Sequence, residues 1–156
     1  MRKLLVIFIA SFILAFAFDQ AVKLLCLDGF RWQSEYIDFV LAFNDGVAFS
    51  MLSFLKHYLK YLHLALIIVL FAYLLWQKSF FKEHILAFAL MFGAGSSNLL
   101  DRFVYGGVID MFFWHKWFEF AIFNIADATI NLSIAIIVIK ELFFRKKPEK
   151  TNEWTV

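Results

Sequence analysis

Four long apolar stretches dominate the chain, at residues 4–25, 58–76, 84–100 and 120–144. A helix needs about 20 mainly apolar residues to cross the hydrocarbon core of a bilayer, and the third stretch is somewhat shorter than this. Only helices and closed barrels satisfy their backbone polar groups in lipid. The pattern therefore predicts an all-α transmembrane bundle of four helices that folds as a single integral membrane domain over residues 1–156.

Two segments between these stretches, residues 28–57 and 101–119, are polar enough to lie outside the membrane. In the first, Asn44-Asp45-Gly46 separates two β-prone runs, which predicts a hairpin or small sheet and then a short helix that leads into the second span. In the second, a strand-like run follows Gly106-Gly107. The β-prone runs are residues 35–43, 47–50 and 108–113. We expect a small β-sheet on one end of the bundle.

Basic residues flank the apolar stretches. Arg2 and Lys3 precede the first, Lys78 and Lys82 lie between the second and third, and an Arg-Lys-Lys run begins the tail at residues 145–156. An even number of spans puts all three groups on one side, which the positive-inside rule assigns to the cytoplasm. The bias is moderate, because the polar segments also contain basic residues. Both termini are then expected in the cytoplasm and the two polar segments on the extracytoplasmic side.

The composition supports a membrane protein, since 63% of residues are hydrophobic and only 18% are charged. A soluble protein of this size would expose much of that surface and aggregate. The net charge of +2 gives no indication of a nucleic-acid partner, and the basic residues suit contact with anionic lipid headgroups. The single cysteine, Cys26, excludes an internal disulfide and a multi-cysteine metal site. It also lacks the small preceding residues of a lipidation site.

The first apolar stretch has a second interpretation, because Arg2-Lys3 and Ala15-Phe16-Ala17 resemble the ends of a cleavable signal peptide. The stretch continues past that point with Asp19 and Lys23, which lie one turn apart on a shared helix face. A retained helix with a buried polar patch accounts for these two residues better than a removed leader does.

Polar residues form one stripe near the outer end of each of the last two stretches. The first stripe is Asn98, Asp101 and Arg102, at positions i, i+3 and i+4, and the second is Asn124, Asp127 and Asn131, at positions i, i+3 and i+7. Because such groups are costly in lipid, both stripes should face the bundle interior, beside the segment that contains Asp110. The asparagines can simply join helices. The three converging carboxylates favour function, either as a pair that activates water for peptide hydrolysis or as a proton relay in a transporter.

Five sequence blocks resemble the signatures of one family, the lipoprotein signal peptidases, also called signal peptidase II. The blocks are Asp19-Gln20 with Lys23, and residues 44–50, 98–102, 107–110 and 123–127. They occur in the order and spacing of that family and cover nearly the whole chain. The resemblance implies an aspartic endopeptidase of the bacterial inner membrane that removes the signal peptide from diacylglyceryl-modified prolipoproteins, cutting before the lipidated cysteine.

The resemblance also implies roles for individual residues. Asp110 and Asp127 would be the catalytic pair, Asn44 and Arg102 would contact the substrate backbone, and Asn98 and Asn124 would support the pair. The expected structural carboxylates and their partner are Asp19, Asp101 and Lys23. No metal or organic cofactor is implied, and we expect a monomer whose partners are lipidated prolipoproteins and membrane lipid.

Ser97 departs from the family pattern, which usually has glycine at this position, and its hydroxyl would narrow the site or add a hydrogen bond. Gly95-Ser96-Ser97 also prompts a rhomboid-like serine peptidase with His63 as base, although Asn98 stands where that motif needs glycine. A small proton-coupled carrier is a further alternative, but it predicts acids spread through the membrane depth. The remaining histidines, His57, His84 and His115, lack the sequence spacing of metal ligands.

Overall fold

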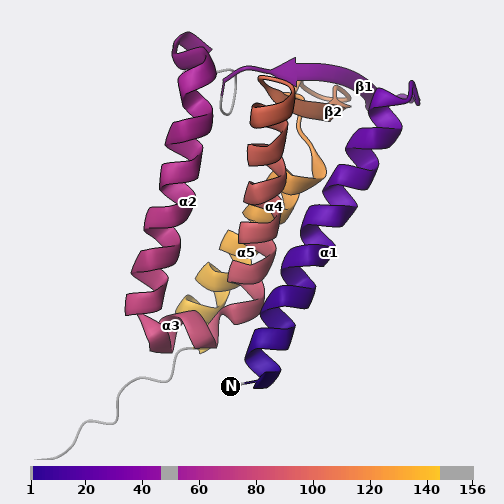
Figure 1. The fold of residues 1–156 in the computed structure, drawn as a ribbon. Helices are drawn as coiled ribbons and strands as arrows, with labels where there is room; N and C mark the ends of the chain where they lie inside the picture. Colours follow the sequence, from indigo (N-terminus) through magenta and orange to yellow (C-terminus); the bar gives the residue numbers. More distant parts are fainter. Residues whose placement is uncertain (1, 47–52, 145–156) are drawn as a thin grey trace, which may run out of the picture.

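The computed structural model describes residues 2–46 and 53–144. Four long helices run side by side and a two-stranded sheet lies across one end of them (Figure 1). The long helices are α1 (Arg2–Leu27), α2 (Leu59–Trp76), α4 (Ile85–Val104) and α5 (Ile125–Ile139). The shorter elements are the strands β1 (Ile37–Asn44) and β2 (Val108–Trp114), the helix α3 (Lys78–Glu83), the 3₁₀ helix η2 (Ser53–Tyr58) and the π-helix η3 (Lys140–Phe144).

The expectation of a mainly helical bundle with a small sheet is confirmed. Within the described residues, α1 and α2 are long and apolar enough to cross a membrane by length and composition. That all four long helices do so stays a prediction. The predicted tail at residues 145–156 lies outside the described residues.

The α1–α4 contact is the tightest between long helices, because α4 presents small residues to α1. A Cβ atom at Gly93 would collide with the main-chain oxygen of Phe12 and would also touch Ala15. Small residues allow helix backbones to approach closely in membranes. On the α1 side the buried residues are Ala15, Asp19, Lys23 and Cys26, which form one stripe at helical spacing. This stripe is the buried polar patch that a retained first helix requires.

The sheet pairs two segments that are distant in sequence. β1 and β2 are antiparallel, with Ala42 opposite Asp110 and Asn44 opposite Val108. The partner of β1 in the described residues is thus β2, and the expected strand at residues 47–50 lies outside the described residues. An irregularity between Phe39 and Ala42 inserts one extra residue into β1. The expected strand at residues 108–113 and the short helix before α2 are both present.

Helix α5 begins five residues later than the predicted fourth stretch. The preceding chain runs extended along β2, where the Phe112 N–H donates to the Phe123 carbonyl at 2.9 Å and the Phe123 N–H donates back at 3.1 Å. Asn124 then caps the helix. Hydrogen bonding to β2 therefore overrides the helical preference of the apolar sequence here, and it places the start of α5 beside Asp110.

Candidate functional site

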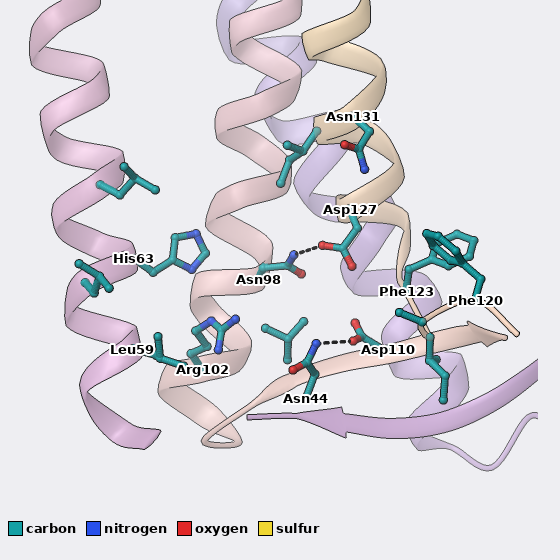
Figure 2. A pocket seen from close by; sticks show the side chains of 16 residues that line it. Asn44, Leu59, His63, Asn98, Arg102, Asp110, Phe120, Phe123, Asp127 and Asn131 are labelled. Atoms are coloured by element: carbon teal, nitrogen blue, oxygen red, sulfur yellow. Dashed lines mark hydrogen bonds between the residues drawn. The ribbon is translucent and has the colours of Figure 1, made fainter. Parts of the chain in front are cut away.

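A cavity of about 480 Å³ lies between α2, α4 and α5 at the end of the bundle near the sheet. Its apolar lining comes from α2, α5, the chain before α5 and Val108 of β2. Its polar lining residues are Asn44, His63, Asn98, Arg102, Asp110, Asp127 and Asn131. Figure 2 shows Asp110 and Asp127 projecting toward the same space from β2 and α5. Five residues of the expected site, Asn44, Asn98, Arg102, Asp110 and Asp127, thus meet in one cavity.

Asp110 is almost fully buried, with 2% of its surface exposed. One carboxylate oxygen accepts a hydrogen bond from the Asn44 amide at 3.1 Å and the other from the Asn124 amide at 2.7 Å. The sheet register explains the first bond, because diagonal neighbours in an antiparallel pair lie on the same face. Burial, reinforced by the charge of Asp127, raises the pKa of Asp110 to about 7 against the lowering effect of both amides.

Asn124 links the two carboxylates. As the N-cap of α5 it accepts a bond from the Asp127 N–H at 2.8 Å, and the Asp127 side chain accepts one from the Asn124 N–H at 3.2 Å. This capping box fixes the Asp127 side chain on the first turn of the helix. The Asn124 amide meanwhile donates to Asp110. One fully buried asparagine therefore sets the position of both acids, although it does not line the cavity itself.

Asn98 supports Asp127 from α4. Its amide nitrogen donates to the Asp127 carboxylate at 2.9 Å, while its oxygen accepts from Lys23 at 2.7 Å and from Asn124 at 3.1 Å. Because Lys23 bonds to the oxygen, the amide nitrogen must point to the acid. The buried lysine thus orients Asn98, which in turn presents a donor to Asp127.

The charged residues expected to be structural lie behind the cavity, between α1 and α4. The Lys23 ammonium bonds Asp19 and Asp101, each at 2.6 Å, and all three side chains are at most 1% exposed. Asp19 also accepts the Ala126 N–H at 2.7 Å, and Asp101 accepts the Ile109 N–H at 3.2 Å. These two carboxylates therefore anchor α5 and β2 to the α1–α4 pair.

Ser97 belongs to this structural network and not to the cavity. It is fully buried, its hydroxyl donates to Asp19 at 2.5 Å, and it accepts from Gln20 at 2.8 Å. Of the two effects expected of the extra hydroxyl, the structure shows an added hydrogen bond. The hydroxyl faces α1 and has no access to the cavity, so the serine-peptidase interpretation lacks an accessible Ser97 nucleophile.

Arg102 lines the cavity from the last turn of α4. Its guanidinium donates to the Gly46 carbonyl at 2.6 Å, in the turn that follows β1. Gly107 allows the end of β1 to approach the start of β2, because a Cβ atom at Gly107 would lie only 3.0 Å from the Asn44 carbonyl oxygen. Asn44 and Arg102 are thereby held in the lining of the cavity.

The fold brings His84 into contact with an acid that the sequence spacing did not indicate. Its Nε2 atom lies 2.9 Å from a Glu141 oxygen, and Glu83 is near enough for the three side chains to surround a metal ion. This group lies beside α3, at the end of the bundle opposite the sheet (Figure 1). It is therefore remote from Asp110 and Asp127.

Sequence reasoning gave no role to Gln20 and treated His63 only as a base for a serine peptidase. Gln20 joins α1 to α4 through Ser97 and Asp101, with a 2.9 Å bond to the latter. The sequence feature that could have indicated this role is the position of Gln20 three residues before Lys23, which puts both on the same helix face. His63 lines the cavity from α2, and nothing in the apolar sequence around it distinguishes that location.

The fold is a bundle of apolar helices whose cavity holds two carboxylates, those of Asp110 and Asp127. A solved structure described as a bacterial membrane enzyme matches the fold over 92% of this chain and 94% of its own, with a TM-score of 0.72 at 22% sequence identity. A second structure of the same description has a TM-score of 0.71 at 21% identity over 88% and 94%.

The sequence comparisons identify the family. The family model for signal peptidase (SPase) II matches residues 11–143. The lipoprotein signal peptidase of Campylobacter jejuni strain 81-176 is 63% identical over 147 residues, which is 94% of each chain. That of Helicobacter pylori strain Shi470 is 51% identical over 149 residues, or 96% of this chain and 95% of the relative. The chain belongs to the signal peptidase II family.

Proposed function

We propose that this protein is an aspartic endopeptidase that removes the signal peptide from diacylglyceryl-modified prolipoproteins, cutting before the lipidated cysteine. Membership of the signal peptidase II family supports prolipoproteins as substrates. The observation that supports the aspartic chemistry is the placement of Asp110 and Asp127 in one cavity with Asn124 bonded to both. Two acids in such a site share one proton, because ionising both of them would place two negative charges close together at a high free-energy cost.

The reaction divides between the two acids. The ionised acid takes a proton from a water molecule as the water oxygen attacks the scissile carbonyl carbon, and the protonated acid transfers its proton to the carbonyl oxygen. The resulting tetrahedral diol collapses as the first acid passes its proton to the leaving nitrogen, the carbon–nitrogen bond breaks and one diol hydroxyl returns its proton to the second acid. The raised pKa of Asp110, about 7, keeps one proton on the pair up to neutral pH.

Neighbouring polar residues hold the substrate and the acids in position. Asn44 and Arg102 line the cavity beside the acids, where they can bind the extended substrate backbone, and Asn98 and Asn124 orient the acids. Asp19, Lys23 and Asp101 stabilise the helix pair behind them.

We place the enzyme in the bacterial inner membrane as a multi-pass monomer, with both termini cytoplasmic and the cavity at the extracytoplasmic face. The basic residues at the ends of the apolar stretches support this orientation. A lipidated cysteine partitions into the bilayer and would then reach the cavity laterally.

The distribution of polar groups disfavours a proton carrier. The acids of the cavity lie near the sheet, whereas an apolar cluster around Leu74, Phe88 and Phe92 separates them from Glu83, His84 and Glu141 at the other end of the bundle. A proton path through the bundle would need acids or water at that depth. The described residues offer an apolar cluster there instead.

The test is cleavage of a lipidated prolipoprotein by purified protein in detergent, followed as a gel shift. Asp110→Asn and Asp127→Asn should each lower the rate by at least about 100-fold, because an amide cannot exchange protons. The double variant should lose little more than either single one, as expected for groups that act together. Near wild-type cleavage by both single variants, expressed at normal levels, would show that the assignment is wrong.

Asp38→Asn is the matched control. Asp38 is also an aspartate of the sheet, but it bonds the Ser34 N–H and His115 and does not line the cavity. Its replacement should leave the cleavage rate within about twofold of wild type, as for a substitution away from the site.

A further inference from the structure

Two polar side chains of the cavity have no role in the mechanism above. His63 projects from α2 at the level of Asn98, and Asn131 lies one turn beyond Asp127 on α5, deeper in the bundle (Figure 2). Neither makes a hydrogen bond with any residue that the structure describes. An amide or imidazole without a partner at membrane depth is unfavourable. Both groups therefore suit a ligand that brings its own polar atoms to this depth.

The surroundings of His63 and Asn131 narrow the choice of ligand. On α2 the other cavity-lining residues are Leu59, Leu62 and Leu66, and on α5 Ile130 lies beside Asn131. The acids, Asn44 and Arg102 occupy the part nearer the sheet. The catalytic acids thus lie toward the sheet, and His63 at the level of Asn98 and Asn131 beyond Asp127 are the polar side chains of the lining next to Leu62, Leu66 and Ile130.

A diacylglyceryl cysteine has the same order of chemical groups. Its peptide and thioether are followed by two ester carbonyls and then by two hydrocarbon chains. An ester carbonyl accepts hydrogen bonds and cannot donate them. An asparagine amide always offers N–H donors, and an imidazole has at least one N–H in either tautomer. The two unpartnered side chains match the number and polarity of the two esters.

We propose that His63 and Asn131 form an ester-binding subsite, in which each donates a hydrogen bond to one ester carbonyl of the diacylglyceryl group. The acyl chains then lie against Leu62, Leu66 and Ile130. This inference rests on the proposed function and adds the residues that recognise the lipid. The subsite positions the cysteine so that the preceding peptide bond lies at the two acids. It contributes to substrate binding and leaves the proton transfers to Asp110 and Asp127.

The test compares two synthetic prolipoprotein peptides that differ only in the lipid linkage, one with diacylglyceryl and one with dialkylglyceryl cysteine. The ether peptide keeps the chains but lacks both carbonyl oxygens. The wild-type enzyme should prefer the ester peptide, chiefly through a lower KM. His63→Leu and Asn131→Leu should each reduce the ester-to-ether ratio of kcat/KM by about 3- to 10-fold, the value of one neutral hydrogen bond. The ratio is measured within one sample, so the folded fraction of a variant cancels.

Two further variants sharpen the result. His63→Gln keeps a donor and should restore part of the preference. His57→Leu makes the same change at a histidine of η2 that does not line this cavity, and it should leave the ratio unchanged. Equal loss on both peptides in His63→Leu and Asn131→Leu would overturn the ester-binding role.

The outcomes also separate this inference from the proposed function. Equal cleavage of both peptides by the wild type would contradict the ester subsite while supporting the peptidase. Cleavage of neither peptide would contradict the proposed function and the inference together.

Discussion

Helices α1 and α2 have almost the same apolar character and very different surroundings. α1 packs closely on α4 and buries an ion pair in its C-terminal half, with Asp19 and Lys23 almost inaccessible. α2 contacts the bundle mainly at the end away from the sheet, through the cluster around Leu74, and buries only Leu59 and Leu74 along its described length. The polar side chain that α2 places in the cavity is His63. This imidazole has no hydrogen-bond partner among the described residues.

This difference separates a helix that stabilises the site from a helix that encloses it. The polar groups of α1 are satisfied by protein, which fixes α4, α5 and β2 around the acids. The face of α2 toward the cavity leaves room for an apolar ligand. Mean hydropathy does not distinguish α1 from α2, because a helix face suits an apolar residue equally whether it meets lipid or an apolar ligand. Substitutions should therefore affect folding on the α1 side and substrate binding on the α2 side.

The largest effect on stability is expected from Lys23→Met. It leaves the buried carboxylates of Asp19 and Asp101 without a cation, and breaking a buried ion pair costs about 3–5 kcal/mol. Thermal unfolding of the purified protein in detergent would show a greatly lowered Tm, or no folded protein would be recovered. Lys3→Met makes the same change at an exposed position of the same helix and should unfold like the wild type. Similar unfolding of both variants would refute a stabilising role for Lys23.

A smaller effect is expected from Gly93→Ala, with Gly95→Ala as its matched control. The new methyl group at Gly93 meets the Phe12 backbone, which should cost about 1–3 kcal/mol as overpacking. At Gly95, on the side toward α2, a Cβ would have only ordinary contacts, at 3.8 Å to Ile67 and 3.9 Å to His63. Gly95→Ala should therefore be tolerated in the same thermal unfolding assay. Equal destabilisation of the two variants would contradict the difference between the two helix contacts.

Substitution of the α2 wall should alter binding more than stability. Leu62→Ala removes a half-exposed side chain from the cavity lining and should change the free energy of unfolding by less than about 0.5 kcal/mol. The KM for the lipidated substrate should rise about threefold or more, since each buried CH₂ contributes about 0.8 kcal/mol. Ile68→Ala, on the same helix outside the cavity, should change neither quantity. An unchanged KM in Leu62→Ala would contradict a role of α2 in substrate binding.

The smallest expected effect is a shift in the pH profile. The pKa of Asp110, about 7, lies above its ordinary value, so the pair should lose its shared proton and its activity as the pH rises through neutrality. The Asn44 amide stabilises the ionised form of Asp110 and lowers this pKa. Asn44→Ala should therefore move the alkaline limb of kcat/KM to higher pH, whereas Asp38→Asn should leave it in place. A downward shift in Asn44→Ala would contradict this coupling.

Much of the site could be predicted from local spacing. Asn98, Asp101 and Arg102 lie three and four residues apart, and the structure places all three toward the interior of the bundle. Asn124 and Asp127 form a capping box at the start of α5. The turn expected at Asn44 is also correct in position, because strand β1 ends at this residue. These features depend on backbone geometry within one or two helical turns, so the sequence around each residue was sufficient.

Other features depend on contacts between distant segments. The β-prone composition of residues 35–43 predicted a strand but did not indicate its partner. That partner is β2, which lies more than 60 residues later in the chain. Ser97 was expected near the site, yet its hydroxyl bonds Asp19 on α1. His84 had no metal-ligand spacing, although its imidazole meets Glu141. Sequence spacing does not reveal such pairings, because they are set by how helices pack and which backbone groups lack partners.

The apolar helices, the polar stripes and the blocks that resemble one family follow from the sequence, since periodicity and motif order are properties of neighbouring residues. The tertiary structure alone decided that Lys23 would join Asp19, Asp101 and Asn98, and that α2 would face an open cavity. The physical reason is the close contact at Gly93, where helix backbones meet and exclude lipid. α4 has no comparable contact with α2 in the described residues, and a cavity remains between α2, α4 and α5.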